Sequence, residues 1–298
     1  SSIVYQCLMD RFDDIAFNDW KNESGVDWFN NAEMDKHYSQ VESDMVLHTF
    51  SPEERNGNAK LFVEACDKLG YKWGNLRRGQ SNCGAEKGND CIGCLGGCFR
   101  DSKQSSLVAF VQKAEKEGLE IITETQIEKV EPNSTTCKIH GLQKGNKVSF
   151  EGKKVILCGG AFGSTRIMMQ SGFQSKLPAL GKNFATHPQF MWLGFQNEIV
   201  DAHKGMFQSV ASKDPSFRAQ GFKLENVFAS PISIGMLMNV TGAEHQRLMK
   251  QYRHIQCIEV AVRDENVGVI KCDNKGKITV EKTLTDQDKT RRDKGLQA

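Results

Sequence analysis

The sequence has no long apolar run and almost no excess charge, and each absence excludes a class of protein. No hydrophobic stretch approaches the roughly 18 residues that a membrane-spanning helix needs, so we expect no membrane span. The 39 Lys and Arg nearly balance the 37 Asp and Glu, a net charge of +2 over 298 residues. Because no block of one sign stands out, we expect no nucleic-acid partner. The start at Ser1 has no signal-peptide pattern, so we expect a soluble chain of unknown localisation.

Cysteine is too scarce for a disulfide-held fold, with 10 in 298 residues, yet part of it is clustered. The cluster consists of Cys83, Cys91, Cys94 and Cys98. Together these thiolates can hold zinc or an iron–sulfur cluster, whereas the C-x-x-C pair alone can form a redox disulfide. Structural zinc sites usually have two such knuckles, so the spacing favours iron–sulfur over zinc. A loop of packed or disulfide-linked cysteines without metal is the other interpretation.

A strand, a glycine turn and a helix form the main candidate for ligand binding. Residues 154–158 are predicted as a short apolar strand, which runs into Gly159, Gly160, Ala161, Phe162, Gly163 and Ser164. Such a turn lets backbone N–H groups and a helix N-terminus face an anionic ligand. The turn departs from G-x-G-x-x-G, because Cys158 takes the place of the first glycine. Residues 152–197 contain no Asp or Glu, so nothing local repels a pyrophosphate; a glycine-packed turn without ligand is the alternative.

The remaining patterns predict an α/β fold that is α+β overall. Apolar spacing predicts helices over residues 57–69 and 107–118, and alternation predicts a strand over 120–127 and a hairpin over 136–150. Ser164 is expected to cap the helix after the glycine turn. Beyond His187 and Pro188 the pattern is mostly strand-like, which places a boundary near residue 188. The histidines form no metal-binding or protease motif, and a lone His187 is more typical of a structural residue than of a base.

Taken in order, these segments resemble the glucose-methanol-choline (GMC) family of FAD-dependent oxidoreductases. Ser1 and Ser2 look like the end of the family's Gly-Gly-Ser-Ser turn, and the strand with Gln126 and Ile127 is similar to the one whose backbone meets the FAD adenine. Residues 157–164 are close to the family's flavin signature. The resemblance implies that the cofactor contacts are Ser1, Ser2, Gln126, Ile127, Gly159, Gly160, Ala161, Gly163 and Ser164.

The resemblance also implies a domain plan. Residues 1–100 would be a flavin-covering segment with the Cys-rich loop, 101–188 part of a Rossmann-like FAD-binding domain, and 189–298 part of a substrate domain on an antiparallel sheet. The family's N-terminal phosphate-binding motif and its C-terminal catalytic histidine have no counterpart here. We therefore expect this chain to be inactive on its own, and we name no catalytic residue.

The function implied is oxidation of the CH–OH group of an alcohol or sugar-like donor by hydride transfer to flavin. The cysteine arrangement resembles a cysteine-rich branch of the family, in which some sugar dehydrogenases carry an iron–sulfur cluster near the flavin. The implied cofactors are thus FAD and an iron–sulfur cluster, and the implied partners are a small alcohol and an electron-acceptor protein or quinone. The alternative is a cysteine-ligated metal or iron–sulfur module for electron transfer without substrate chemistry.

Overall fold

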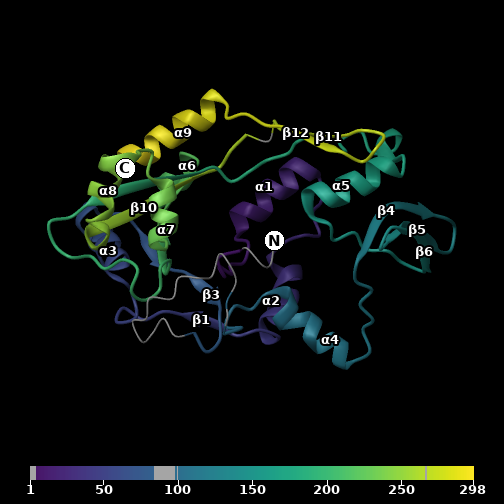
Figure 1. Cartoon of the computed structure of the whole chain (residues 1–298), viewed down its shortest axis with the longest axis horizontal. Helices are drawn as coiled ribbons and strands as arrows, with labels where there is room; N and C mark the ends of the chain where they lie inside the picture. The colour runs from purple at the N-terminus through teal and green to yellow at the C-terminus, as the bar shows by residue number, and fades with distance from the viewer. Residues whose placement is uncertain (1–4, 84–97, 99, 266) are drawn as a thin grey trace. The chain divides into compact units, whose positions relative to one another are not determined.

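The chain folds into two compact units (Figure 1). The computed structural model describes residues 5–83, 98, 100–265 and 267–298. The first unit consists of the described residues up to Leu119, Gln189–Val262 and Arg292–Ala298, and the second of Glu120–Pro188 and Arg263–Arg291. Both units combine helices with antiparallel strands, which confirms the predicted mixed α/β, α+β class. No helix in these described ranges is both long and apolar enough to cross a bilayer.

The first unit is built on a five-stranded sheet of order β2-β8-β9-β10-β7. Its strands are β2 (Trp73–Asn75), β8 (Val210–Ser212), β9 (Phe222–Asn226), β10 (Ile255–Val262) and β7 (Gln189–Phe195). A separate two-stranded sheet joins β1 (Leu47–Thr49) to β3 (Arg77–Gly79). The helices are α1 (Asp14–Ser24), α2 (Asn31–Ser43), α3 (Gly57–Leu69), the π-helix η2 (Leu107–Val111), α4 (Gln112–Lys116), α6 (Pro215–Ala219), α7 (Pro231–Leu237), α8 (Gly242–Met249) and the 3-10 helix η4 (Tyr252–His254).

Helix α3 shows how sequence dictates structure in this unit, and its predicted range is confirmed. Its N-terminus is capped by Asn56, whose side chain accepts a hydrogen bond from the backbone of Ala59, and Gly70 ends it in the left-handed conformation. The apolar face of α3, including Phe62 and Cys66, packs against one face of the five-stranded sheet. The opposite face of that sheet is covered by a second apolar cluster that contains Phe50, Met206, Phe207, Phe228 and Cys257.

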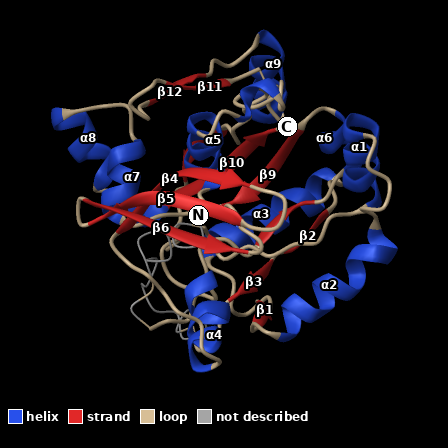
Figure 2. Cartoon of the chain, turned by 90° about the vertical axis from the view of Figure 1, so that its right-hand side faces the viewer, coloured by secondary structure: helices blue, strands red, loops and turns tan. Residues whose placement is uncertain are grey.

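The second unit contains a three-stranded antiparallel sheet and a helix that packs on it. The sheet runs β4 (Thr125–Pro132), β5 (Cys137–Gln143), β6 (Asn146–Gly152), and Figure 2 shows its strands side by side. The other elements are α5 (Gly160–Gln170), the 3-10 helix η3 (Phe173–Ser175), β11 (Val269–Cys272) and β12 (Ile278–Glu281). The chain passes from the second unit to the first within α9 (Asp286–Gln297).

A buried ion pair joins the two chain segments of the second unit close to where each meets the first. The Asp264 carboxylate accepts from the backbone N–H and the hydroxyl of Thr186, both at 3.0 Å, and lies 2.9 Å from the Lys282 ammonium group. Phe184 and Gly268 exchange a pair of backbone hydrogen bonds nearby, each 2.9 Å long. The segments on either side of Gln189–Val262 are therefore held together at their ends.

Three predictions of local structure differ from what is observed. Residues 154–158 carry no strand hydrogen bonding, and Ile156 is 84% exposed, because the described chain places no neighbouring strand beside them. The strand expected over 120–127 begins five residues later, as β4. The helix expected over 107–118 starts with the π-helical turn η2 and ends at Lys116.

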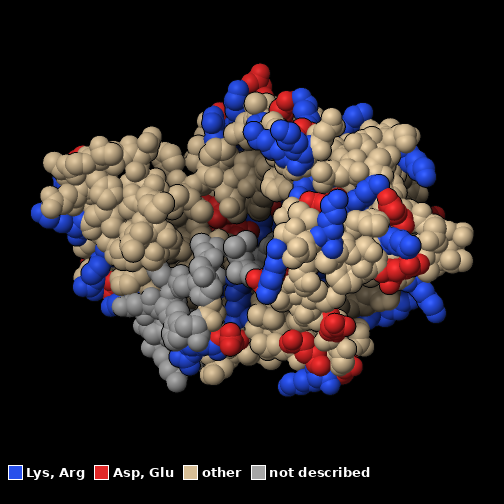
Figure 3. All heavy atoms as spheres, turned by 45° about the vertical axis from the view of Figure 1, so that its right-hand side comes forward, with Lys and Arg blue, Asp and Glu red and all other residues tan. Residues whose placement is uncertain are grey.

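The face drawn in Figure 3 carries both signs of charge. Lys and Arg lie beside Asp and Glu over part of this face, other parts have few charged side chains, and neither sign covers the face alone. This agrees with the near balance of charges in the sequence. The assignment of an FAD domain and a substrate domain to particular residues stays a prediction.

Candidate cofactor-binding turn and the adjacent cavity

Two glycines make the turn before α5 possible. Gly160, the first residue of α5, has a φ of +70°, a conformation that side chains other than that of glycine rarely adopt. At Gly159, an added Cβ would lie only 2.9 Å from the backbone nitrogen of Ser164. The chain therefore folds back tightly on itself here, and only glycine fits.

Ser164 closes this turn, but it does not cap the helix as expected. Its hydroxyl accepts a hydrogen bond from the Gly159 backbone N–H at 3.0 Å and lies 3.4 Å from the Leu157 carbonyl oxygen. The helix begins four residues earlier, at Gly160, because a glycine can take the left-handed conformation that starts it. Ser164 is thus the fifth residue of the helix, and its hydroxyl reaches back from there to the glycine turn.

The N-terminus of α5 is free to face a ligand. No side chain caps it, and Gly159, Gly160, Ala161 and Phe162 are all exposed. The first N–H groups of a helix have no intrahelical acceptor, and they carry the positive end of its dipole. An added Cβ at Gly163 would meet no atom within 4 Å. The turn therefore combines hydrogen-bond donors with open space, as the binding of an anionic group requires.

The structure brings the glycine turn and the predicted adenine-contacting strand into one unit. Arg166 on α5 donates a hydrogen bond to the backbone carbonyl of Ile127 at 2.9 Å. At the residue that follows α5, the Ser171 hydroxyl accepts from the backbone N–H of Val130 at 2.9 Å. The strand β4 carries an irregularity between Ile127 and Lys129, which interrupts its pairing with β5. No sequence motif marks Arg166, so its role in positioning β4 is visible only in the structure.

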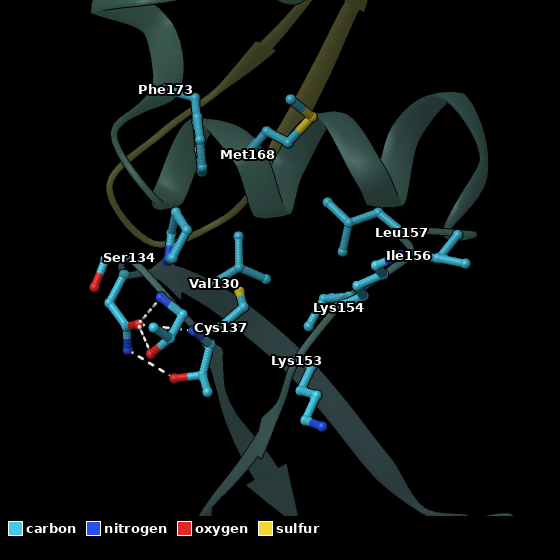
Figure 4. Close-up of a pocket in the computed structure, with 14 residues that line it drawn as sticks. Val130, Ser134, Cys137, Lys153, Lys154, Ile156, Leu157, Met168 and Phe173 are labelled. Carbon is cyan, nitrogen blue, oxygen red and sulfur yellow. Dashed lines mark hydrogen bonds between the residues drawn. The ribbon is translucent and has the colours of Figure 1, made fainter.

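A cavity of about 590 Å³ lies beside this turn, within the same unit (Figure 4). Its walls are mainly apolar, with Val130 from β4, Met168 from α5 and Phe173 from η3, and Lys153 and Lys154 add positive charge. No Asp or Glu is among the described residues that line it. A cavity of this kind accepts an apolar or flat group and tolerates negative charge nearby.

The turn between β4 and β5 borders this cavity and is locked by its own hydrogen bonds. The Asn133 side-chain oxygen accepts from the backbone N–H groups of Thr135 and Thr136 at 2.9 and 2.8 Å. Figure 4 shows these bonds on the side of the cavity opposite Leu157 and Ile156. Asparagine forms such turns readily, so this wall is built by local sequence.

Several predicted site residues cannot be placed. Ser1, Ser2, Cys91 and Cys94 lie outside the described residues. Cys83 and Cys98 are described and are half-buried. Within the described part of the chain, no group of three or more His, Cys, Asp or Glu side chains is arranged to hold a metal ion. The cysteine-ligated cluster therefore stays a prediction.

Comparison with known proteins supports the resemblance. A family profile described as GMC oxidoreductase matches residues 1–189. An uncharacterized GMC-type oxidoreductase of Mycobacterium tuberculosis is 22% identical over 256 residues, which cover 85% of this chain and 39% of that protein. A long-chain-alcohol oxidase of Arabidopsis thaliana is 25% identical over 254 residues, which cover 76% of this chain and 33% of the relative.

The chain thus spans about two-fifths or less of the length of these relatives. The profile nevertheless matches 189 of its 298 residues, which is more than half. Since that match covers the cofactor-contact segments quoted from the sequence, the chain belongs to the GMC oxidoreductase family.

Proposed function

We propose that this chain is part of an FAD-dependent oxidoreductase that oxidises the CH–OH group of an alcohol or sugar-like donor by hydride transfer to flavin. The observation that carries the proposal is the turn Gly159–Ser164 with its uncapped helix N-terminus, in a chain whose family generally binds FAD. The name of the Arabidopsis relative, a long-chain-alcohol oxidase, supports an alcohol as donor.

The residues of the turn fit a role in holding FAD. The backbone N–H groups of the exposed residues Gly160 and Ala161 can donate to an anionic or carbonyl oxygen of the cofactor, and Gly163 leaves room for its approach. Gln126 and Ile127 are proposed to meet the adenine through their backbone, and Arg166 holds that strand against α5. FAD, when bound, supplies the hydride-accepting chemistry.

We propose no catalytic base among the histidines of this chain. The proposed electron acceptor is a protein or a quinone, and an iron–sulfur centre on the cysteines would give electrons a path from the flavin to it. No described contact favours the alternative of an electron-transfer module without substrate chemistry.

A visible absorption spectrum of the full-length protein, purified without oxygen, tests the proposal. We expect flavin bands that bleach when 1-dodecanol, ethanol or glucose is added, with at least one of these donors active. A residual broad absorption after bleaching would support the cysteine-ligated cluster. A colourless protein, or flavin bands that no alcohol or sugar bleaches, would refute the proposed oxidation.

A further inference from the structure

Two glutamates face each other across neighbouring strands on a buried face of the first unit's sheet. In the register of β9 and β10, Glu225 lies directly opposite Glu259. Their exposed fractions are 5% and 1%. Like charges directly opposite one another destabilise a sheet, and burial makes each charge more costly. Two full negative charges at this position therefore oppose folding.

The hydrogen bonds around the pair leave two acceptor atoms without donors. Glu225 is held by the Lys223 ammonium group and by the side-chain amide of Gln208, each at 2.5 Å. One oxygen of Glu259 accepts from the Gln189 amide at 2.5 Å, while its Oε2 has no partner. The Oε1 of Gln208 is also buried and without a partner, although the same amide binds Glu225. Gln208 is 1% exposed, so solvent does not satisfy it.

The charged and titratable groups near the pair lie on several strands. Lys223 on β9 is the cation paired with Glu225. Its charge also acts on Glu259, which lies on the neighbouring strand β10. From β7 the facing group is the neutral Gln189, and on β10 itself the nearest titratable group is the thiol of Cys257. From β3, Arg78 donates to the backbone carbonyl of Gln208 at 2.7 Å.

We propose that Glu225 and Glu259 together bind one proton, carried by Glu259, and that release of this proton is a pH-sensitive switch that weakens the five-stranded sheet. A proton on Glu259 removes one of two buried, facing negative charges and turns Oε2, a buried acceptor without a donor, into a hydroxyl that can itself donate. β10 pairs with both β9 and β7, so the cost of ionising Glu259 falls on the strand that joins the edge strand β7 to the rest of the sheet.

The direction of the pKa shift agrees with this geometry. Burial first, and the charge of Glu225 second, raise the pKa of Glu259 from its usual 4.5 to about 7. In the unfolded chain this carboxyl group ionises at its usual pKa, whereas in the folded chain it ionises only at the raised pKa. The free energy of unfolding is therefore unaffected by this group below the usual pKa, and it declines as the pH rises from there to the raised value. Between pH 4.5 and 7 we therefore expect the unfolding equilibrium constant to rise on the order of a hundredfold through this group.

The test uses the full-length protein and two measurements. Infrared difference spectra across a pH titration should show the C=O stretch of a protonated carboxyl group at pH 6, lost by about pH 8 and absent in Glu259→Gln. The midpoint of denaturant unfolding should decline between pH 4.5 and 7 in the wild type, and much less in Glu259→Gln. In Glu225→Gln the like charge is gone, so the infrared band should disappear at lower pH than in the wild type.

Glu198→Gln, a change of an exposed glutamate in the same unit, is the matched control and should behave as the wild type. If Glu259→Gln does not fold, Glu225→Gln still tests the proposal through the shifted band. A band that Glu259→Gln leaves in place, or one that Glu225→Gln does not shift, would overturn it. An identical pH dependence of stability in the wild type and Glu259→Gln would overturn it as well.

Discussion

Replacing Gly163 by alanine should make the protein more stable and its cofactor affinity weaker, because the helix and the ligand place opposite demands on this position. Gly163 is the fourth residue of α5, and its φ lies outside the left-handed region. An alanine side chain there would meet no protein atom within 4 Å. The substitution therefore adds helix propensity without a clash.

The two effects can be estimated separately. Glycine inside a helix costs about 0.5–1 kcal/mol relative to alanine, so the free energy of unfolding should rise by about that amount. The same methyl group would occupy the open space through which we propose that the cofactor approaches the first turn. A loss of at least tenfold in FAD affinity, about 1.4 kcal/mol, is expected.

Denaturant unfolding and a fluorescence titration of FAD into the full-length apoprotein measure the two quantities. Gly160→Ala is the matched control, because its φ of +70° strains alanine without any clash. This control should lower stability by about 1–2 kcal/mol. Unchanged FAD affinity in Gly163→Ala would show that the turn does not face the cofactor. Lower stability in that variant would show that the helix does not begin where the structure places it.

Three further changes test other contacts. Asn58→Ala removes a side chain that bonds the backbone of Cys257 twice and that of Val227 once, at 2.8–3.0 Å in the core, and should cost about 3 kcal/mol or more in urea unfolding. Arg166→Met should lower FAD affinity several-fold while costing only about 1 kcal/mol of stability, and equal FAD affinity would argue against its role in positioning β4. Burial raises the pKa of the Asp264 carboxyl group, but its hydrogen bonds with Lys282 and Thr186 outweigh burial and bring this pKa below its usual value. Stability should therefore fall as the pH drops below about 4, and Asp264→Asn should remove this part of the acid sensitivity in thermal unfolding. An acid sensitivity that Asp264→Asn leaves unchanged would show that the ion pair does not stabilise this site.

The sequence predicted those elements whose cause is local. Helix α3 follows from its apolar spacing and from Gly70, and the strands of the second half of the chain follow from alternation. The glycine turn could also be located, because its glycines are required by backbone conformation and close approach. Ser164 was misplaced, since periodicity does not show that a glycine with positive φ starts the helix early.

What the sequence could not supply depends on contacts between distant segments. Residues 154–158 are apolar enough for a strand, but a strand also needs a neighbour to bond with, and composition does not show one. The pairing of Glu225 with Glu259 depends on the register between strands that lie far apart in the chain. Residues two apart in a strand share a face, so the sequence alone places Glu259 on the same face as Cys257. Because that face is expected to be apolar, this spacing would have marked Glu259 as a buried carboxylate.

The bond between Thr186 and Asp264 gives the second unit a modular character. Because this bond and the Phe184–Gly268 bridge hold its two chain segments together, the stretch Gln189–Val262 leaves and returns at nearly one point. Seen from the second unit, this stretch is an insertion whose ends lie close together, and its strands form one sheet with β2 in the first unit. A short glycine linker from Pro188 to Arg263 should therefore let the two chain segments of the second unit fold as one chain, separately from the first unit.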